Sequence, residues 1–278
     1  MRYATKPRVT RYADAVSSER TTDVLPSLLA TFASRFDFRM IEIVLHGETL
    51  GEVAGLPITN AMVYSWFVTA LIVLGAFVIR KKTALIPTRA QGLVESVLGG
   101  TRDFMADILG SVKKANVFFP FIASLFFFIL LNNWLALLPL GSLQFHGHHI
   151  FRTTNSDLNH TLILAVLAVV MIQFFGVATL GFVKYAHKFF VNPLKDPIGA
   201  FIGILELVSE VAKMISFSFR LFGNIFAGEV LLVIISYLLP VGAPLPFMFL
   251  EMFVGLIQAV VFATLTLGFV KIATSEHH

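Results

Sequence analysis

Long apolar runs alternate along the chain with short stretches that collect most of its charged residues. A helix needs about 20 consecutive apolar residues to cross the hydrocarbon core of a bilayer. Five runs reach or exceed this length, at about residues 59–79, 117–138, 160–183, 197–239 and 245–273. We therefore predict an all-α polytopic membrane protein with about five membrane helices, in which residues 40–276 form one membrane domain.

The last two runs are longer than a single crossing requires. The first of them, from Pro197 to Leu239, is interrupted only by glycines and would measure about 60 Å as a helix. It should either kink near Gly223 or lie steeply tilted in the membrane. The connection to the final run, LLPVGAPLPF at 238–247, is short and rich in proline. We predict a long, tilted C-terminal helical hairpin.

Three segments outside the apolar runs have their own patterns. Residues 83–114 place apolar and charged side chains at helical spacing, which predicts an amphipathic helix on the membrane surface. Residues 40–57 fit a short interfacial helix that ends in a glycine-rich turn. Residues 1–39 are polar and carry charges of both signs, whereas a mitochondrial presequence contains few acids. A disordered or weakly structured N-terminal tail is therefore favoured.

The distribution of basic residues predicts the topology. Lysine and arginine occur at 80–114, at 184–195 and at Lys271, whereas 140–158 and 239–246 nearly lack them. Because cytoplasmic loops are enriched in lysine and arginine, five spans place the C-terminus in the cytoplasm and the N-terminus outside. The basic residues of the tail oppose this orientation from a greater distance. The formal net charge of +4 therefore reflects topology rather than nucleic-acid binding.

Several kinds of chemistry lack support in the sequence. The chain has no cysteine, which excludes disulfides and thiolate metal ligands. His146, His148 and His149 lie in a polar loop without a nearby pair of acids, so a solvated loop is favoured over a metal site. No phosphate-binding loop of the GxxxxGK[ST] kind occurs. We expect no metal, no cofactor and no direct ATP binding.

The most distinctive stretch is SEVAKMISFSFRLFGNIFAGE at 209–229, which places charged residues inside an apolar run. A charge near the centre of a membrane helix costs at least about 2.5–3.5 kcal/mol. Arg220 keeps its proton in proteins, so it is a permanent positive charge at membrane depth. At about 100° per residue one helix face carries a polar stripe, formed by Glu206, Ser209, Lys213, Ser216, Arg220 and Asn224.

The stretch RLFGNIFAGE at 220–229 resembles the signature of the membrane-embedded a subunit of rotary F-type ATP synthases. The similarity extends upstream through Glu206, Lys213 and Ser216, and downstream to Gln258. NNWLALLP at 132–139 and PTRAQGLVES at 87–96 also fit this family, so the resemblance covers roughly residues 57–276. It implies an ion-translocating stator subunit of the ATP synthase membrane sector, with the proton as the expected ion. The implied partners are the c-ring, the b subunits of the peripheral stalk and membrane lipid.

The resemblance also implies roles for individual residues. Arg220 would separate two half-channels that lead to the carboxylates of the c-ring, with Asn224 holding the guanidinium or a water near it. The cytoplasmic half-channel would contain Glu206, Ser209, Lys213 and Ser216, and the outer one Glu229, Glu251 and Gln258. Asp157 and Asn159 would line an outer entrance. Many relatives carry one glutamate and one histidine where this chain has Glu229 and Glu251.

Other interpretations of these residues stay open at this point. Arg220 could be a structural residue that pairs with Glu206, Glu210 or Glu229, and Lys213 could extend to the membrane interface. Asp157 or Asn159 could cap a helix. Glu210 lies off the stripe, so we leave it outside the predicted site.

Other functions are also conceivable. A stand-alone secondary transporter is the alternative, but such proteins usually contain internal repeats, and none is evident here. A membrane scaffold that transports nothing would leave Arg220 unexplained. Since no clear presequence is present, we expect a bacterial inner membrane rather than a mitochondrial one.

Overall fold

The computed structural model describes residues 49–53, 56–82, 88–138, 144–145, 148–149, 153–189, 196–239 and 242–275. All of these residues belong to one compact unit, residues 44–278. The predicted N-terminal tail over 1–39 lies outside the described residues.

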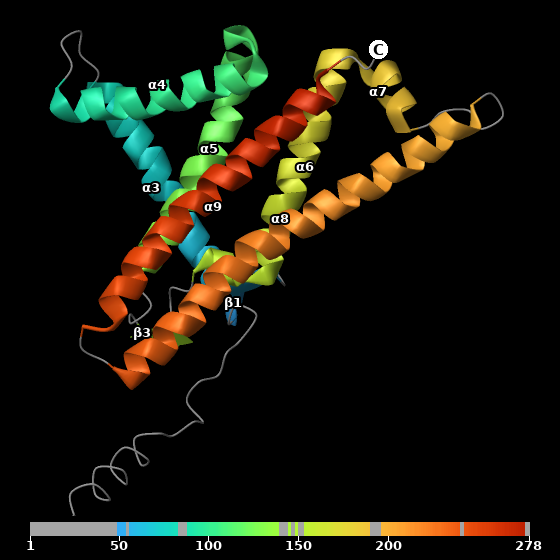
Figure 1. Cartoon of the computed structure of the whole chain (residues 1–278). Helices are drawn as coiled ribbons and strands as arrows, with labels where there is room; N and C mark the ends of the chain where they lie inside the picture. The colour runs from blue at the N-terminus through green and yellow to red at the C-terminus, as the bar shows by residue number, and fades with distance from the viewer. Residues whose placement is uncertain are drawn as a thin grey trace, which may run out of the picture. The chain divides into compact units, whose positions relative to one another are not determined.

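Five helices in the described part are long and apolar enough to cross a membrane, and Figure 1 shows their arrangement. They are α3 (Asn60–Lys82), α5 (Val112–Ala136), α6 (Leu158–Leu180), α8 (Pro197–Leu238) and α9 (Pro244–Ala273). Their positions agree with the five apolar runs to within a few residues. The all-α polytopic membrane class is confirmed.

The two C-terminal helices form the predicted hairpin (Figure 1). Asp196 caps the start of α8 by accepting a hydrogen bond from the backbone N–H of Gly199, and Pro197 occupies the first turn, where its missing N–H is harmless. The helix is continuous from Pro197 to Leu238. Gly223 therefore does not interrupt the helix.

Helix α4 (Arg89–Leu109) is the amphipathic helix predicted for 83–114. Thr88 caps its start, and Gly110 ends it in the left-handed conformation, with φ 66°. This conformation suits glycine because it has no Cβ, and it allows α5 to begin two residues later (Figure 1). Met105 and Leu109 of α4 are buried against α5 and α9.

The core lies where α9 packs against α5, α6 and α8. Phe217 of α8 and Phe262 of α9 stack with ring centroids 4.6 Å apart, and both are buried with Ile129 and Ala165. Large apolar side chains elsewhere on the spanning helices point outward, for example Leu74 of α3 and Ile163 of α6, at 62% and 64% exposed. Outward apolar side chains are typical of helices that face lipid.

The connecting segments contain structure that the sequence patterns did not predict. The short interfacial helix expected at the start of 40–57 lies outside the described residues. Where the glycine-rich turn after it was expected, β1 (Thr49–Val53) pairs antiparallel with β2 (Leu56–Thr59). This stretch mixes β-branched residues, which favour strands, with glycine and proline, which favour turns. Such a composition favours a hairpin over a helix. The expected loop at 140–158 contains β3 (Gln144–Phe145), β4 (His148–His149) and the 3-10 turn η3 (Thr154–Ser156). The basic loop at 184–195 begins with helix α7 (Phe182–Phe189).

Candidate ion-translocation site

Arg220 lies half-buried near the middle of α8. Its guanidinium donates a hydrogen bond of 3.2 Å to the hydroxyl oxygen of Ser216, one helical turn earlier. Within the part of the chain that the structure describes, no carboxylate lies within ion-pair distance of Arg220. Arg220 therefore does not form the structural ion pair with Glu206, Glu210 or Glu229 that was the alternative interpretation.

Four charged side chains alternate in sign at the N-terminal half of α8. Lys188 of α7 contacts Glu206 at 2.8 Å, and Lys213 lies 4.0 Å from the same carboxylate oxygen. Lys213 also contacts Glu210 at 2.7 Å, one turn away on α8, and sits 4.6 Å above the ring of Phe269 on α9. We call Lys188, Glu206, Glu210 and Lys213 the charge cluster. The Lys213 side chain is only 14% exposed, so it is held in this cluster rather than extended away from the helix bundle.

Helix α7 docks onto the charge cluster because two glycines leave room for it. A Cβ on Gly203 of α8 would lie 2.4 Å from the carbonyl oxygen of Phe189, and one on Gly176 of α6 would lie 2.3 Å from the ring of Tyr185. The Tyr185 hydroxyl donates to Gln173 of α6. Burial, with the nearby carboxylates of Glu210 and Glu206, raises the pKa of Tyr185 to about 12, so the phenol stays protonated at neutral pH.

Beyond Arg220, the polar side chains of α8 meet those of α9. The Asn224 amide donates a 2.7 Å hydrogen bond to Oε1 of Gln258. The sequence had led us to expect the Asn224 amide beside the Arg220 guanidinium or a water near it. In the structure this amide binds Gln258. One turn further along α8, the Glu251 carboxyl lies against Gly228. Glu251 and Gln258 face α8 together, as their spacing of seven residues predicts.

Glu229 belongs to the same region. It lies within electrostatic range of Glu251 on α9 and of Tyr64 on α3. The three side chains come from three different helices, so this region gathers polar groups that are far apart in sequence. Ser209 lies on the other side of Arg220 along α8, on the polar stripe, and its side chain is half-buried.

A buried polar layer joins α5, η3 and the start of α6. The Asn155 amide donates to Asn133 at 2.6 Å, and Asn133 in turn donates to the carbonyl oxygen of Gly255 on α9 at 3.1 Å. Asp157 is 5% exposed and caps α6 by accepting from the backbone N–H of Asn159. The capping interpretation of Asp157 is thus confirmed, while Asn159 has an exposed side chain.

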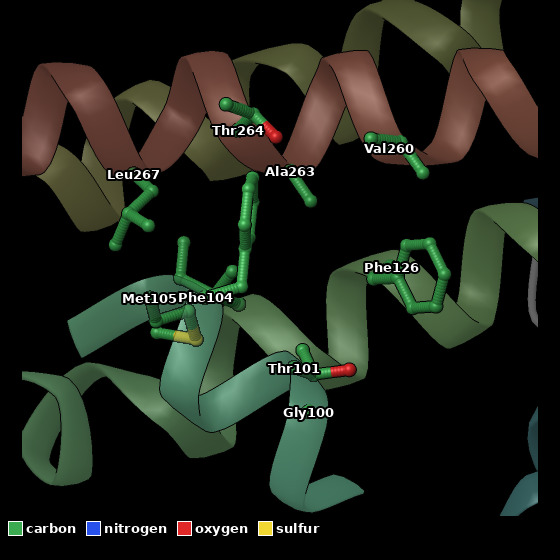
Figure 2. Close-up of a pocket in the computed structure, with 10 residues that line it drawn as sticks. Gly100, Thr101, Phe104, Met105, Phe126, Val260, Ala263, Thr264 and Leu267 are labelled. Atoms are coloured by element: carbon green, nitrogen blue, oxygen red, sulfur yellow. The ribbon is translucent and has the colours of Figure 1, made fainter. Parts of the chain in front are cut away.

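The structure also contains an apolar pocket of about 320 Å³ between α4, α5 and α9. Figure 2 shows Phe104, Phe126 and Leu267 among the side chains that line it. Its lining residues include no titratable side chain and none from α8. No group of three or more histidine or acidic side chains suited to a metal occurs among the described residues. The polar groups that could conduct an ion therefore lie along α8 and its neighbours.

Comparison with known protein families decides what kind of protein carries this arrangement. The family model described as ATP synthase A chain matches residues 62–271. The chain belongs to the ATP synthase A chain family. The match includes α8 and most of α9, with Arg220, Glu251 and Gln258. This A chain is an integral membrane protein and a subunit of the ATP synthase membrane sector, in which it works with the c-ring.

Sequence reasoning missed two members of the charge cluster. Glu210 was left out because it lies off the polar stripe, and Lys188 because its segment was expected to be a loop. The spacing of three residues between Glu210 and Lys213 is a signal that could have found the first, since such pairs are neighbours on a helix. Nothing in the sequence indicates the docking of α7 that brings Lys188 to Glu206.

Proposed function

We propose that this A chain is the proton-conducting stator half of the ATP synthase membrane sector. In this proposal Arg220 separates two access routes to the carboxylic acids of the c-ring. The observation that carries it is the environment of Arg220, a permanent charge held by Ser216 with no carboxylate partner in the described part of the chain. Such a guanidinium is available to a carboxylate that another subunit presents.

The proposed mechanism is electrostatic. A carboxylic acid that faces lipid is neutral, because an isolated charge in hydrocarbon is costly. A unit positive charge about 4 Å away is worth about 4 kcal/mol at an effective dielectric constant of about 20, which corresponds to roughly three pK units in favour of the carboxylate. The acid therefore releases its proton as it approaches Arg220, and takes up another only after it has moved past.

Two sets of polar residues serve as the routes. On one side of Arg220 along α8 lie Ser216, Lys213, Ser209 and Glu206, in this order away from the arginine. Lys213 and Glu206 belong to the charge cluster. On the other side lie the Asn224–Gln258 pair and the carboxyl groups of Glu229 and Glu251. Asp157 and Asn159 at the start of α6 form the outer entrance in this proposal. Since Arg220 lies between the two sets, a free proton that crosses from one to the other is repelled.

Further partners and the location follow from the same proposal. The b subunits of the peripheral stalk bind the A chain, and lipid covers the outward apolar side chains of α3 and α6. The membrane is a bacterial inner membrane, an assignment supported by the acidic residues among the basic ones of the tail.

The test compares Arg220→Ala with Arg102→Ala, which removes an exposed arginine of α4. Both variants are expressed in the whole ATP synthase, and ATP synthesis is measured in membrane vesicles with subunit content checked by blot. We expect Arg220→Ala to lose coupled synthesis at least about 100-fold, a lower bound to the roughly 1000-fold that about 4 kcal/mol corresponds to, while Arg102→Ala retains it. Near wild-type synthesis by an assembled Arg220→Ala enzyme would refute the proposal.

A further inference from the structure

We propose that Glu210 is a further proton-carrying residue of the cytoplasmic route, although it lies outside the polar stripe of α8. The inference rests on the proposed function, since it assumes that protons move past this end of α8. It adds a carboxyl group that lies within electrostatic range of Tyr185 on α7 to the route formed by Glu206, Ser209, Lys213 and Ser216.

The first support is the environment of the Glu210 carboxylate. Glu210 is 8% exposed, and its Oε1 accepts a 2.7 Å hydrogen bond from the Lys213 ammonium. Its Oε2 is buried and has no hydrogen-bond partner within the described residues. A buried charged oxygen that lacks a partner is costly. A proton or a bound water supplies the partner that Oε2 lacks among the described residues.

The second support is the connection of Glu210 to the edge of the helix bundle. Lys213 bridges Glu210 and Glu206, and Glu206 contacts Lys188 of α7. Lys188 and Glu206 have side chains that are 16% and 27% exposed, so exposure increases from Glu210 toward Glu206. Tyr185 of α7, whose hydroxyl donates to Gln173 of α6, lies within electrostatic range of both carboxylates. The polar path therefore runs from a partly exposed carboxylate to a buried one.

A purely structural role accounts for less of the geometry. A buried ion pair is often no more stabilising than apolar residues of the same volume, and an acid inside a membrane helix carries a cost of its own. The cluster balances two lysines with two glutamates, yet Oε2 of Glu210 is left without a hydrogen-bond partner among the described residues, which charge compensation alone does not explain. Glu210 lies ten residues before Arg220, four residues closer than Glu206, and is thus the carboxylate of this route nearest to the arginine along α8.

The proposed step is a reversible proton transfer. A hydronium ion on the ring side gives a proton to Oε2: one of its O–H bonds breaks and leaves a neutral water, while a lone pair of Oε2 forms the new O–H bond and the carboxylate becomes a neutral acid. Transfer of the same proton to a water near Glu206 breaks that bond, converts this water into hydronium and restores the anion. Lys213 remains an ammonium throughout, and no other bond changes.

The test uses two size-matched pairs, so that shape and proton binding are separated. Glu210→Gln is compared with the wild-type chain, and Glu210→Asn with Glu210→Asp, all in the whole ATP synthase. After removal of the catalytic head from membrane vesicles, passive proton conduction is driven by a potassium diffusion potential, with subunit content checked by blot. The control is Asp103→Asn, which removes an exposed carboxylate beside Arg102.

We expect the acid of each pair to conduct at least fivefold more than its amide, and the control to match the wild type. Equal conduction by the acid and the amide in either assembled pair would overturn the proposal. Because the Arg220→Ala comparison is made separately, a failure here with Arg220→Ala inactive would refute only the role of Glu210. A functional Arg220→Ala enzyme would refute the proposed function itself.

Discussion

At the scale of single residues, the closest approach within the C-terminal hairpin is between Gly228 and Glu251. A Cβ on Gly228 would lie 1.8 Å from Oε1 of Glu251, a distance that no real contact reaches. The carboxyl group of Glu251 can therefore occupy this position only because Gly228 has no side chain. Small residues serve the same purpose wherever membrane helices pack closely.

This contact predicts that Gly228→Ala impairs the enzyme through Glu251. The new methyl group displaces the carboxyl group by an ångström or more, and misplacement of that size costs about 10- to 100-fold in rate when a group must be held in place. ATP synthesis in vesicles should fall by this amount while the complex stays assembled. The matched control is Gly223→Ala, whose Cβ meets nothing within 4 Å. Equal activity of the two variants would contradict the role given to Glu251.

Sequence reasoning predicted the residue types of the site better than their contacts. Helical spacing placed Ser216 one turn from Arg220, and the two do form a hydrogen bond. Helical spacing could not predict the hydrogen bond between Asn224 and Gln258, because this contact depends on how α9 is positioned along α8. Glu210 was left out for a different reason, because it lies off the polar stripe, and its surroundings include Tyr185 of α7 as well as Lys213 of α8.

At the scale of elements, hydropathy was sufficient for the long helices. Apolar length alone gave all five candidate spans, because each helix satisfies its backbone hydrogen bonds internally. Helix α7 and the β1–β2 hairpin were not predicted. Both are short, and α7 depends on contacts with Gly176 and Gly203 that lie outside its own sequence.

Helix α8 is expected to face water along its polar stripe only. Since the chain has no native cysteine, single cysteines can be placed at 209, 216, 217 and 219 and treated in membranes with a water-soluble thiol reagent. Positions 209 and 216 should react about tenfold faster or more, because the reagent attacks a hydrated thiolate. Phe217 is 2% exposed and Phe219 is 58% exposed, so position 219 separates exposure to water from exposure to lipid or to the ring.

Similar labelling rates at 216 and 219 would contradict a water-filled route along the stripe. A low labelling rate at position 217 alone would not support the water-filled route, because the burial of this position in the hairpin is enough to explain slow labelling.

At the scale of the whole membrane unit, basic residues mark one end of the helices. Arg80, Lys81 and Lys82 end α3, Lys188 is at the end of α7 and Lys271 is at the end of α9. Lys271 also donates a 2.6 Å hydrogen bond to the carbonyl oxygen of Ile108, which joins α9 to α4. From the positive-inside rule we expect this end to face the cytoplasm, which is why the proposal assigns the charge cluster of α7 and α8 to the cytoplasmic route.

The central claim is that Arg220 keeps two half-channels apart while the ring turns. A membrane potential of 100 mV supplies only about 2.3 kcal/mol per charge, less than the roughly 4 kcal/mol of an arginine–carboxylate contact. One ion's share of the field therefore does not pull an acid away from Arg220. The next acid of the ring must exchange with it, so proton flow requires rotation.

The most direct test is the proton leak through a complex whose ring cannot turn. Vesicles with the catalytic head attached and no nucleotide present are energised by a potassium diffusion potential, and proton flux is compared between the wild-type chain, Arg220→Ala and Arg220→Lys. We predict no measurable leak in the wild type and a clear leak in Arg220→Ala, because the positive charge between the routes is gone. Arg220→Lys should leak less than Arg220→Ala but fail to synthesise ATP, since lysine is a compact, strongly hydrated charge that can lose its proton. A locked, fully assembled Arg220→Ala complex that is as proton-tight as the wild type would contradict the account.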